Sequence, residues 1–299
     1  MWPLESARLT EEHARRSAGL AALRYGIRAP LEPLRAGANH VFRAGEAVIR
    51  VAPQSVDVAG QVALARWLIA EGFAVPAPLE EAEQIDGSWV SLWEYVPADP
   101  GRPVEFEQLG EVVARLHGVA PARVDDVVPL PCCGDAAWLA IERRLADAEA
   151  VGVVAGSGLS ALRQASLGLR GWRERARRGV QVVCHGDVHP RNVLMRGDEV
   201  VIVDWDLICR GPAAWDHAAL IPWADRYGGP AAAYPDFARG YGADLRDSPL
   251  AQELAAVRLL AATLNTIAMA ADDPSYTGEA KARMRYWTGD PAAPTWTAL

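Results

Sequence analysis

The chain's most informative stretch runs from residue 183 to residue 206 and reads Val183-Cys-His-Gly-Asp-Val-His-Pro-Arg-Asn-Val-Leu-Met-Arg-Gly-Asp-Glu-Val-Val-Ile-Val-Asp-Trp-Asp206. Two short apolar runs that suit β-strands flank residues 196–199, which suit a turn. Antiparallel pairing across that turn places the residue before the first run next to the residue after the second. We therefore expect a hairpin that brings the amide of Asn192 beside the carboxylate of Asp204.

This pair of oxygen-bearing side chains is typical of a magnesium ion held together with a nucleotide. Magnesium takes few protein ligands and keeps water and phosphate oxygens in its remaining positions. Asp187 lies five residues before Asn192, in a stretch that Pro190 keeps as a loop. A carboxylate in such a loop could orient a hydroxyl nucleophile and accept its proton. The segment therefore indicates phosphoryl transfer to a hydroxyl.

The composition narrows the function classes. The 299 residues include 38 acidic and 30 basic side chains, which gives a net charge of −8, and 51% of the residues are hydrophobic. This predicts a folded chain with a core for one large domain or two ordinary ones, and the acidic balance disfavours general nucleic-acid binding. Lys281 is the only lysine, and it follows an alanine, so the chain has no Gly-Lys phosphate-binding loop.

The cysteine pattern and the apolar stretches indicate the cellular setting. The four cysteines show no Cys-x-x-Cys spacing, which disfavours a zinc site, and four thiols in a chain of this size do not suggest a disulfide framework. The first residues lack the pattern of a secretory leader, and the uncharged stretch 259–271 is too short to cross a membrane. We expect a cytoplasmic monomer or homodimer with no membrane or nucleic-acid partner.

The periodicity of apolar residues predicts two lobes. Residues 1–96 carry a helix from Thr10 to about Tyr25, short strands, a helix over about 57–71 and a hairpin at Asp86-Gly87. The Pro-rich segment 97–103 suits a hinge or linker. Residues 104–299 are mainly helical, with a small β element at 181–203. The helices expected there span about 105–117, 136–150, 160–178, 212–223, 230–241, 249–270 and 278–287.

The motif His185-Gly-Asp-x-x-x-x-Asn192, followed by Asp204-Trp-Asp206, resembles the aminoglycoside phosphotransferase family, and the resemblance covers most of the chain. It implies a bilobal α+β protein-kinase-like fold with an antiparallel sheet in the N-terminal nucleotide-binding lobe and a mainly helical C-terminal lobe for catalysis and substrate binding. It also implies that Asp187 is the catalytic aspartate and that Asn192 and Asp204 bind magnesium.

Three further residues of this region receive roles. For Asp206 two interpretations stay open, in which the carboxylate assists the metal or faces solvent. Asp216, in Trp215-Asp216, resembles the structural aspartate of the family that buttresses the catalytic loop. His185 is expected to brace the same loop rather than to bind a metal with His189.

The resemblance places the nucleotide, ATP or GTP, in the N-terminal lobe. Gly37 and Asn39 stand in the loop over the phosphates, and the backbone groups of Glu94 and Val96 would bind adenine. Val48-Ile-Arg-Val51 matches the strand whose lysine touches the α- and β-phosphates, and this chain carries Arg50 there. Arginine can hold phosphates with two donors, but its fork differs in shape from an ammonium group.

The usual glutamate partner of that lysine aligns with Gln61, which cannot form an ion pair. Gln61 could hydrogen-bond Arg50, or it could only pack or face solvent. Glu46 and Glu71 are possible substitutes for the missing carboxylate.

The leading hypothesis is a magnesium-dependent enzyme that transfers the γ-phosphate of a nucleotide to a hydroxyl of a small molecule, with an antibiotic favoured on the resemblance alone. A metabolite kinase for an amino alcohol, a sugar or homoserine is the alternative, and a nucleotide-binding pseudoenzyme is a third interpretation. Acidic residues of the C-terminal lobe could recruit a cationic acceptor, or they could be ordinary surface charges. They are Asp225, Asp236, Asp244, Glu253, Asp272 and Asp273.

Overall fold

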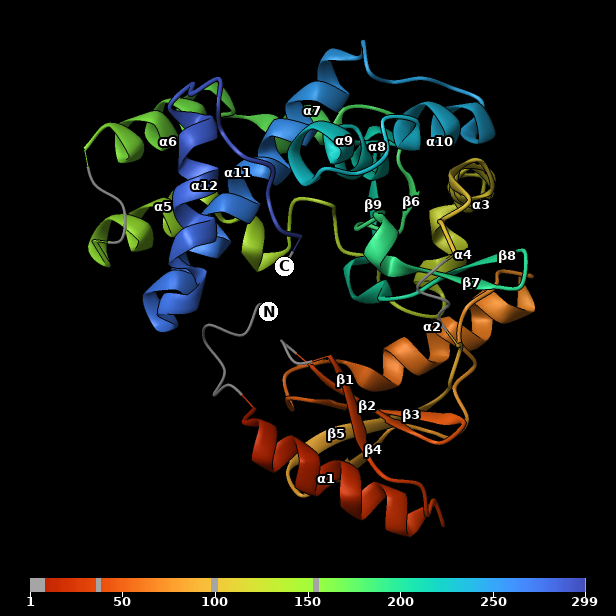
Figure 1. The fold of residues 1–299 in the computed structure, drawn as a ribbon. Coiled ribbons are helices and arrows are strands. Elements are labelled where there is room, and N and C mark those ends of the chain that lie inside the picture. The colour runs from red at the N-terminus through yellow and green to blue at the C-terminus, as the bar shows by residue number, and fades with distance from the viewer. Residues whose placement is uncertain (1–8, 36–38, 98–101, 153–155, 299) are drawn as a thin grey trace. The chain divides into compact units, whose positions relative to one another are not determined.

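The computed structural model describes residues 9–35, 39–97, 102–152 and 156–298. The described chain forms two compact units, shown in Figure 1. The first comprises the chain up to Val104 together with 122–130 and 190–206. The second comprises 105–121, 131–189 and the chain from Leu207 onward. The hairpin quoted above is therefore packed with the N-terminal strands, although it lies late in the sequence.

The first unit is built on a five-stranded antiparallel sheet with the order β1-β2-β3-β5-β4. Its sharpest turn joins β4 to β5 through Asp86 and Gly87, with φ values of +51° and +75°. Two positive φ values in succession are the mark of a type I′ hairpin, which the Asp-Gly pair predicts. The strands are β1 (Glu32–Arg35), β2 (His40–Ala44), β3 (Ala47–Ala52), β4 (Glu83–Ile85) and β5 (Ser88–Glu94).

Helix α1 (Glu11–Arg24) covers one face of this sheet. Thr10 caps it by accepting a hydrogen bond from the N–H of His13, and the small buried residues Ala14 and Ala18 let the helix approach the strands closely. On β3 the fully buried Ile49 belongs to the same core as α1. Because side chains alternate along a strand, Arg50 lies on the opposite face, the side of the sheet on which α2 (Val58–Ala70) is seen in Figure 1.

The hairpin of β7 (Val193–Arg196) and β8 (Glu199–Ile202) has the expected register. Val193 pairs with Ile202, and the N–H of Val203 donates to the carbonyl of Asn192 at 2.9 Å. The sequence pattern indicated one β element over 181–203. In the structure β6 (Val182–Cys184) pairs instead with β9 (Cys209–Gly211), whose three residues are too few to show a periodicity.

The second unit is a layer of helices around α11, which is the longest helix among the described residues and contributes most to the core. Two expected helices are broken in the structure: 136–150 is interrupted at Ala140, and 160–178 at Gly171, whose φ is +76°. The helices of this unit are α3 (Phe106–His117), η1 (Ala137–Leu139), α5 (Ile141–Ala150), α6 (Ser157–Gly168), α7 (Trp172–Arg177), α8 (Ala214–Leu220), α9 (Trp223–Tyr227), α10 (Ala233–Tyr241), α11 (Pro249–Asp272), η4 (Pro274–Tyr276) and α12 (Thr277–Trp287). Two short helices, α4 (Pro121–Asp125) and η3 (Trp205–Leu207), belong mostly to the first unit.

Helix α11 is also the one described helix long and apolar enough to cross a membrane by length and composition. However, 67% of its most apolar window is buried inside the protein. Packing in the core therefore accounts for its apolar sequence.

Helices α3 and α10 pack closely because each carries a glycine at the crossing. A Cβ atom on Gly110 of α3 would lie 2.1 Å from the carbonyl oxygen of Phe237, and one on Gly240 of α10 would lie 1.8 Å from that of Glu107. Neither backbone can yield without moving a helix. The close approach matters for the candidate site, since α3 ends in His117, which contacts the buried carboxylate of Asp216.

Gly240→Ala should therefore lower the free energy of unfolding by about 1 to 3 kcal/mol, the usual cost of overpacking a core. Chemical denaturation monitored by circular dichroism measures it. Gly278→Ala is the matched control, because Gly278 lies in α12 and a methyl group there would have no atom within 4 Å, and we expect it to be neutral or stabilising. Equal effects of the two substitutions would contradict the packing argument.

Candidate active site

In the N-terminal unit, the carboxylate of Asp206 gathers three polar side chains. Arg50 forms an ion pair with it through a short Nη2–Oδ2 contact, and Asn39 donates to the same oxygen at 3.1 Å. Gln61 of α2 donates to Oδ1 at 2.9 Å. The carboxylate of Asp206 is thus bound by three donors while 25% of its side chain stays exposed, and its support of a metal stays a prediction.

This arrangement also revises the expectation for Gln61. Gln61 does not take the place of the missing glutamate beside Arg50, since both residues bind Asp206. Of the proposed substitutes, Glu71 is engaged elsewhere, since its carboxylate accepts from Arg123 at 2.7 Å, and among the described residues no ion pair joins Glu46 to Arg50. The cation on β3 thus keeps a carboxylate partner, but the partner comes from 156 residues further along the chain.

Three buried polar atoms around Asp206 lack partners among the residues that the structure describes. They are Arg50 Nε, Gln61 Oε1 and Asn39 Oδ1. Burial opposes the charge of Arg50, but the carboxylates of Asp206 and Asp204 outweigh it and raise the pKa of Arg50 above its ordinary value. A permanently charged guanidinium with an unused N–H suits a phosphate oxygen, so this group fits a nucleotide.

The hairpin holds the expected metal ligands next to this group in the same unit. Asn192 is buried, and Asp204 follows β8 with φ +65°, a left-handed conformation that is costly for a residue other than glycine. The indole N–H of Trp205 donates to the carbonyl of Ile202 at 3.0 Å and helps to fix this turn. The amide and carboxylate oxygens are the hard donors that Mg²⁺ prefers, so the residues fit the metal.

Asp204 has one ion pair here, with Arg35 at 2.5 Å. The side chain of Arg35 is 61% exposed, so this surface pair contributes little and does not hold the carboxylate against a divalent ion.

Three further residues are predicted to bind the nucleotide. Gly37 lies outside the described residues. The N–H of Glu94 donates to the carbonyl of Ala77, Val96 follows the end of β5, and their binding of adenine stays a prediction.

In the helical unit, the loop after β6 is tied to the buried carboxylate of Asp216 on α8. The backbone N–H groups of His185 and Gly186 donate to its two oxygens at 2.9 Å and 2.8 Å. His117, at the end of α3, adds a contact of 3.0 Å through Nε2. Burial would raise the pKa of Asp216, but His117, His185 and the Gly186 N–H lower it. The carboxylate therefore stays ionised and fixes the loop.

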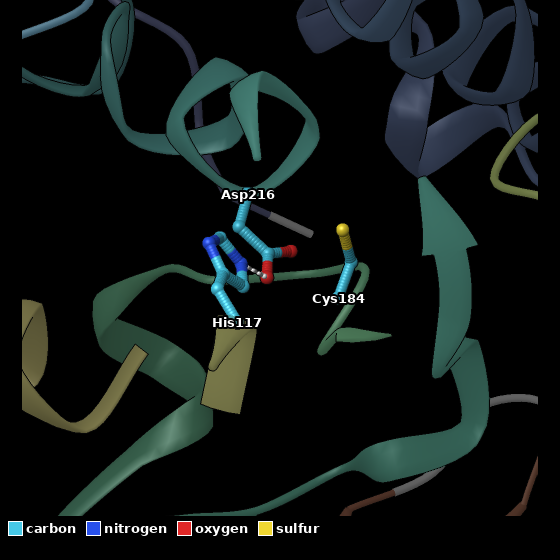
Figure 2. A group of neighbouring side chains, drawn as sticks. All are labelled: His117, Cys184 and Asp216. Carbon is cyan, nitrogen blue, oxygen red and sulfur yellow. Dashed lines mark hydrogen bonds and ion pairs between the residues drawn. The ribbon is translucent and has the colours of Figure 1, made fainter. Parts of the chain in front are cut away.

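Figure 2 shows that Cys184 completes a group with His117 and Asp216, whose ligand atoms lie within 4.8 Å of one another. This spacing would suit a metal ion, but the donors are already used. Asp216 accepts from three N–H groups, and His117 Nδ1 lies 2.9 Å from the hydroxyl of Tyr241. Burial raises the pKa of the Cys184 thiol well above its ordinary value. The group is a hydrogen-bonded support for the loop.

Gly186 is required by the same loop. Its φ is +89°, and a Cβ atom would lie 2.0 Å from the carbonyl oxygen of Leu207. Only glycine combines this conformation with this close approach. The next residue, Asp187, is thereby turned into a fixed position, and its N–H donates to Nδ1 of the buried His185 at 3.2 Å.

The carboxylate of Asp187 lies between the side chains of His189 and Arg258. His189 Nε2 is 3.2 Å from Oδ2, and Arg258 forms a short ion pair with Oδ1. Burial acts to raise the pKa of Asp187, but His189, Arg258 and His185 together hold it well below its usual range. His189 is itself held by stacking on Trp223, with ring centroids 5.5 Å apart. Asp187 is therefore ionised at neutral pH and partly exposed, as a proton acceptor must be.

Arg258 is a site residue that the sequence reasoning missed. It is buried on α11, where Nη1 donates to the carbonyl of Gly186 at 2.7 Å while Nη2 contacts Asp187. Its guanidinium also lies over the rings of Trp215 and Trp138, at 5.0 Å and 5.5 Å. A signal was present, because Arg258 is the only charged residue between Leu254 and Asp272.

Similarity to known proteins agrees with this geometry. The sequence pattern of the phosphotransferase enzyme family matches residues 30–260. The chain belongs to this family. It is accordingly a small-molecule phosphotransferase with the kinase-like fold that the motif predicts. No curated protein is significantly similar to the phosphotransferase in sequence.

Solved structures share the fold of the phosphotransferase at low identity. A choline/ethanolamine kinase family protein from Mesorhizobium loti is 23% identical, with a TM-score of 0.67 over 95% of each chain. Amicoumacin kinase hAmiN, solved with AMP-PNP, Ca²⁺ and Ami, is 15% identical, with a TM-score of 0.68 over 96% of this chain and 97% of that one. Aminoglycoside phosphotransferase APH(3'')-Id from Streptomyces rimosus is 20% identical, with a TM-score of 0.60 over 82% and 98%.

Arg258 should act as a positioning residue in the phosphotransferase. Arg258→Gln removes the cation beside Asp187 and the donor to Gly186, so we expect kcat to fall about 100-fold, as for a displaced catalytic group. The pKa of Asp187 should rise, and the acidic limb of the pH–rate profile should move to higher pH. Steady-state rates across pH measure both effects. Arg175→Gln is the control. It removes a partly exposed arginine of α7 that pairs with Glu253 on α11, the helix that carries Arg258. An unshifted pH profile in Arg258→Gln would refute the role.

A buried histidine beside Asp216 should make the phosphotransferase sensitive to acid. His217 Nδ1 lies 2.9 Å from the hydroxyl of Tyr234, and Nε2 has no hydrogen-bond partner in the described part of the chain. Burial, with the nearby His117, lowers the pKa of His217 from 6.5 to about 4. Between these two values the unfolded chain binds a proton that the folded chain does not, so stability falls as the pH falls.

The protonation of His217 should lower the free energy of unfolding by about 3 kcal/mol between pH 7 and pH 4. Urea denaturation at a series of pH values measures it. His217→Asn, which keeps a hydrogen-bonding side chain without a titrating ring, should show a shallower decline over this range. Parallel stability curves for the two proteins would contradict the prediction.

Proposed function

We propose that this phosphotransferase moves the γ-phosphate of ATP or GTP to a hydroxyl group of a small-molecule acceptor, with Asp187 as the general base. The observation that carries the proposal is the carboxylate of Asp187, which Gly186, His189 and Arg258 fix and which stays ionised. A carboxylate held in this way is prepared to orient a hydroxyl and take its proton.

The N-terminal unit supplies the nucleotide end of the reaction in this proposal. Arg50 offers its free Nε–H to a phosphate oxygen while Asp206 neutralises the rest of its guanidinium. Asn192 and Asp204, with Asp206 in support, would hold Mg²⁺. When bound, the metal would balance the charge that develops on the phosphate oxygens. The loop 185–192 carries Asp187 and Asn192 within five residues of each other, so one segment serves both ends of the reaction.

The chemical step is a direct displacement at phosphorus. Asp187 accepts the hydroxyl proton, a new bond forms between the acceptor oxygen and the γ-phosphorus, and the bond from that phosphorus to the bridging oxygen breaks to release the nucleoside diphosphate. Positioning and charge neutralisation supply most of the rate enhancement in such transfers. The fixed Asp187 and the charged Arg50 are the parts of this chain that provide them.

For the acceptor, we propose an antibiotic first, so that the reaction would give resistance or self-protection. Several kinase-like neighbours are antibiotic kinases by name, including the amicoumacin kinase and the APH(3'')-Id enzyme. A metabolite is the alternative, because the Mesorhizobium loti neighbour is a choline/ethanolamine kinase family protein. In either case we propose a cytoplasmic enzyme, as a monomer or homodimer, with no nucleic-acid or membrane partner.

A cationic acceptor remains a prediction from the sequence, and the acidic residues suggested for it are mostly engaged. Asp236 pairs with Arg239, Asp244 with Arg246, and Glu253 with Arg175. Asp273 accepts a hydrogen bond from the N–H of Ser275, while Asp225 and Asp272 are exposed. Asp236, Asp244 and Glu253 therefore serve in ion pairs and Asp273 as a cap.

Asp187→Asn tests the proposal. The amide keeps the shape of the side chain but cannot take a proton, so turnover should fall by about 10² to 10⁴, the usual contribution of a general base. The assay follows ³²P from ATP or GTP with Mg²⁺ into a panel that includes spectinomycin, streptomycin, a macrolide, choline and ethanolamine. Binding of AMP-PNP, measured by thermal shift, should persist because the N-terminal unit is unchanged.

Asp236→Asn is the matched control, since it alters an acidic side chain on the surface of the same unit. Turnover by Asp187→Asn equal to that of the control would overturn the assignment of the base. A wild-type protein that binds AMP-PNP but transfers phosphate to no compound and to no water would favour the pseudoenzyme interpretation.

A further inference from the structure

One stripe of α11 carries partly exposed side chains next to the buried Arg258. Arg258, Ala262, Asn265 and Met269 follow one another at intervals of four, three and four residues, which places them on one stripe of the helix. Arg258 is buried against Asp187, whereas the other three are partly exposed. Helix α5 and the short helix η1 supply further side chains to this stripe, Arg144 and Trp138.

Arg144 of α5 is buried without a charged partner. Its side chain makes one hydrogen bond, a long one of 3.5 Å from Nη1 to Oδ1 of Asn265, and its Nε has none. In the described ranges of the chain no carboxylate lies within ion-pair distance of it. Only 7% of the residue is exposed. Burying an unpaired guanidinium is costly, and its charge cannot be removed by deprotonation at physiological pH.

Trp138 of η1 adds a second unused donor nearer to the catalytic segment. Its indole Nε1–H is buried and has no hydrogen-bond partner among the described residues. Its ring lies 5.5 Å from the guanidinium of Arg258, which contacts Asp187. Two donors from the η1–α5 segment are therefore unsatisfied on the stripe of α11 that begins at the proposed base.

A third buried arginine, Arg283, has a guanidinium that is saturated with hydrogen bonds. Arg283 of α12 donates to Glu279 at 2.7 Å, to the carbonyl of Ala262 at 3.1 Å and to that of Thr297 at 2.6 Å. Arg258 is likewise used by Gly186 and Asp187. Arg144 differs from both because its hydrogen-bonding capacity is almost wholly free.

We infer that Arg144 and Asn265, together with Trp138, form a subsite for an anionic group of the acceptor, such as a carboxylate, sulfate or phosphate. The inference rests on the proposed transfer to a hydroxyl. Seven residues of helix separate Arg258 from Asn265, so the subsite lies about 10 Å along α11 from the arginine that holds Asp187. The acceptor therefore carries its anionic group about 10 Å from the hydroxyl that is phosphorylated.

Arg144→Met tests this subsite, because methionine keeps the length and apolar stem of the side chain. The probes are pairs of hydroxylated compounds that differ only in a carboxylate against its neutral amide, together with inorganic sulfate. Thermal shift in the presence of AMP-PNP and Mg²⁺ measures binding. The wild type should prefer the carboxylate of a pair by roughly 10- to 100-fold, the strength of one or two charged hydrogen bonds, and Arg144→Met should lose this preference and its response to sulfate.

The melting temperature without ligand separates a binding role from a structural one. Arg144→Met removes an unpaired buried charge and should leave the protein as stable as the wild type or more stable. Arg283→Met is the matched control and should be less stable, because it leaves three hydrogen-bond acceptors without their donor. A loss of stability in Arg144→Met as large as that in Arg283→Met would overturn the inference, and so would an equal preference for carboxylates in wild type and variant.

The two proposals fail in different ways. If the subsite is wrong, Asp187→Asn still abolishes transfer while carboxylate and amide compounds bind alike to the wild type and to Arg144→Met. If the proposed function is wrong, no compound is phosphorylated, although the carboxylate preference and its dependence on Arg144 remain measurable by thermal shift. Asn265→Leu supplies a second variant, which should weaken the carboxylate preference without removing a charge.

Discussion

The buried carboxylate of Asp216 accepts hydrogen bonds from the backbone of His185 and Gly186 and from His117, and the catalytic segment depends on it. A loop cannot hold a reactive side chain steadily unless its own backbone groups are satisfied. Asp216 meets that requirement from one side and Arg258 from the other, through the carbonyl of Gly186. The loop that carries Asp187 is thereby fixed between the anion of Asp216 on α8 and the cation of Arg258 on α11.

Arginine takes on the charged roles of this protein because lysine is nearly absent from it. On β3, Arg50 faces Asp206, and its remaining N–H is left for a phosphate. A guanidinium can bind a carboxylate and a phosphate oxygen at the same time through different nitrogens, whereas an ammonium group offers a single point charge. The exchange of the expected glutamate for Gln61 is consistent with this, since Arg50 forms its ion pair with Asp206, two residues after the proposed metal ligand Asp204.

The helical unit distributes its charge in the same manner. Its surface carboxylates are largely paired with arginines. Its buried charges include the carboxylate of Asp216 and the guanidiniums of Arg144, Arg258 and Arg283. Asp216, Arg258 and Arg283 are saturated with hydrogen bonds, whereas Arg144 makes a single long one. The anionic group that we infer at Arg144 would supply its missing partner.

The sequence by itself determined the β7–β8 hairpin and its register, because these depend on short-range spacing and on alternation along strands, and its motif resemblance gave the kinase-like fold. The roles of Asp187, Asn192 and Asp204 stay predictions from that resemblance. The sequence did not determine the partner of Arg50, the break at Gly171 or the role of Arg258. Those depend on which residues meet across 156 positions in one case and 71 in another. A single arginine in an apolar helix marks a buried charge, but only the tertiary structure decides which carboxylate or ligand it serves.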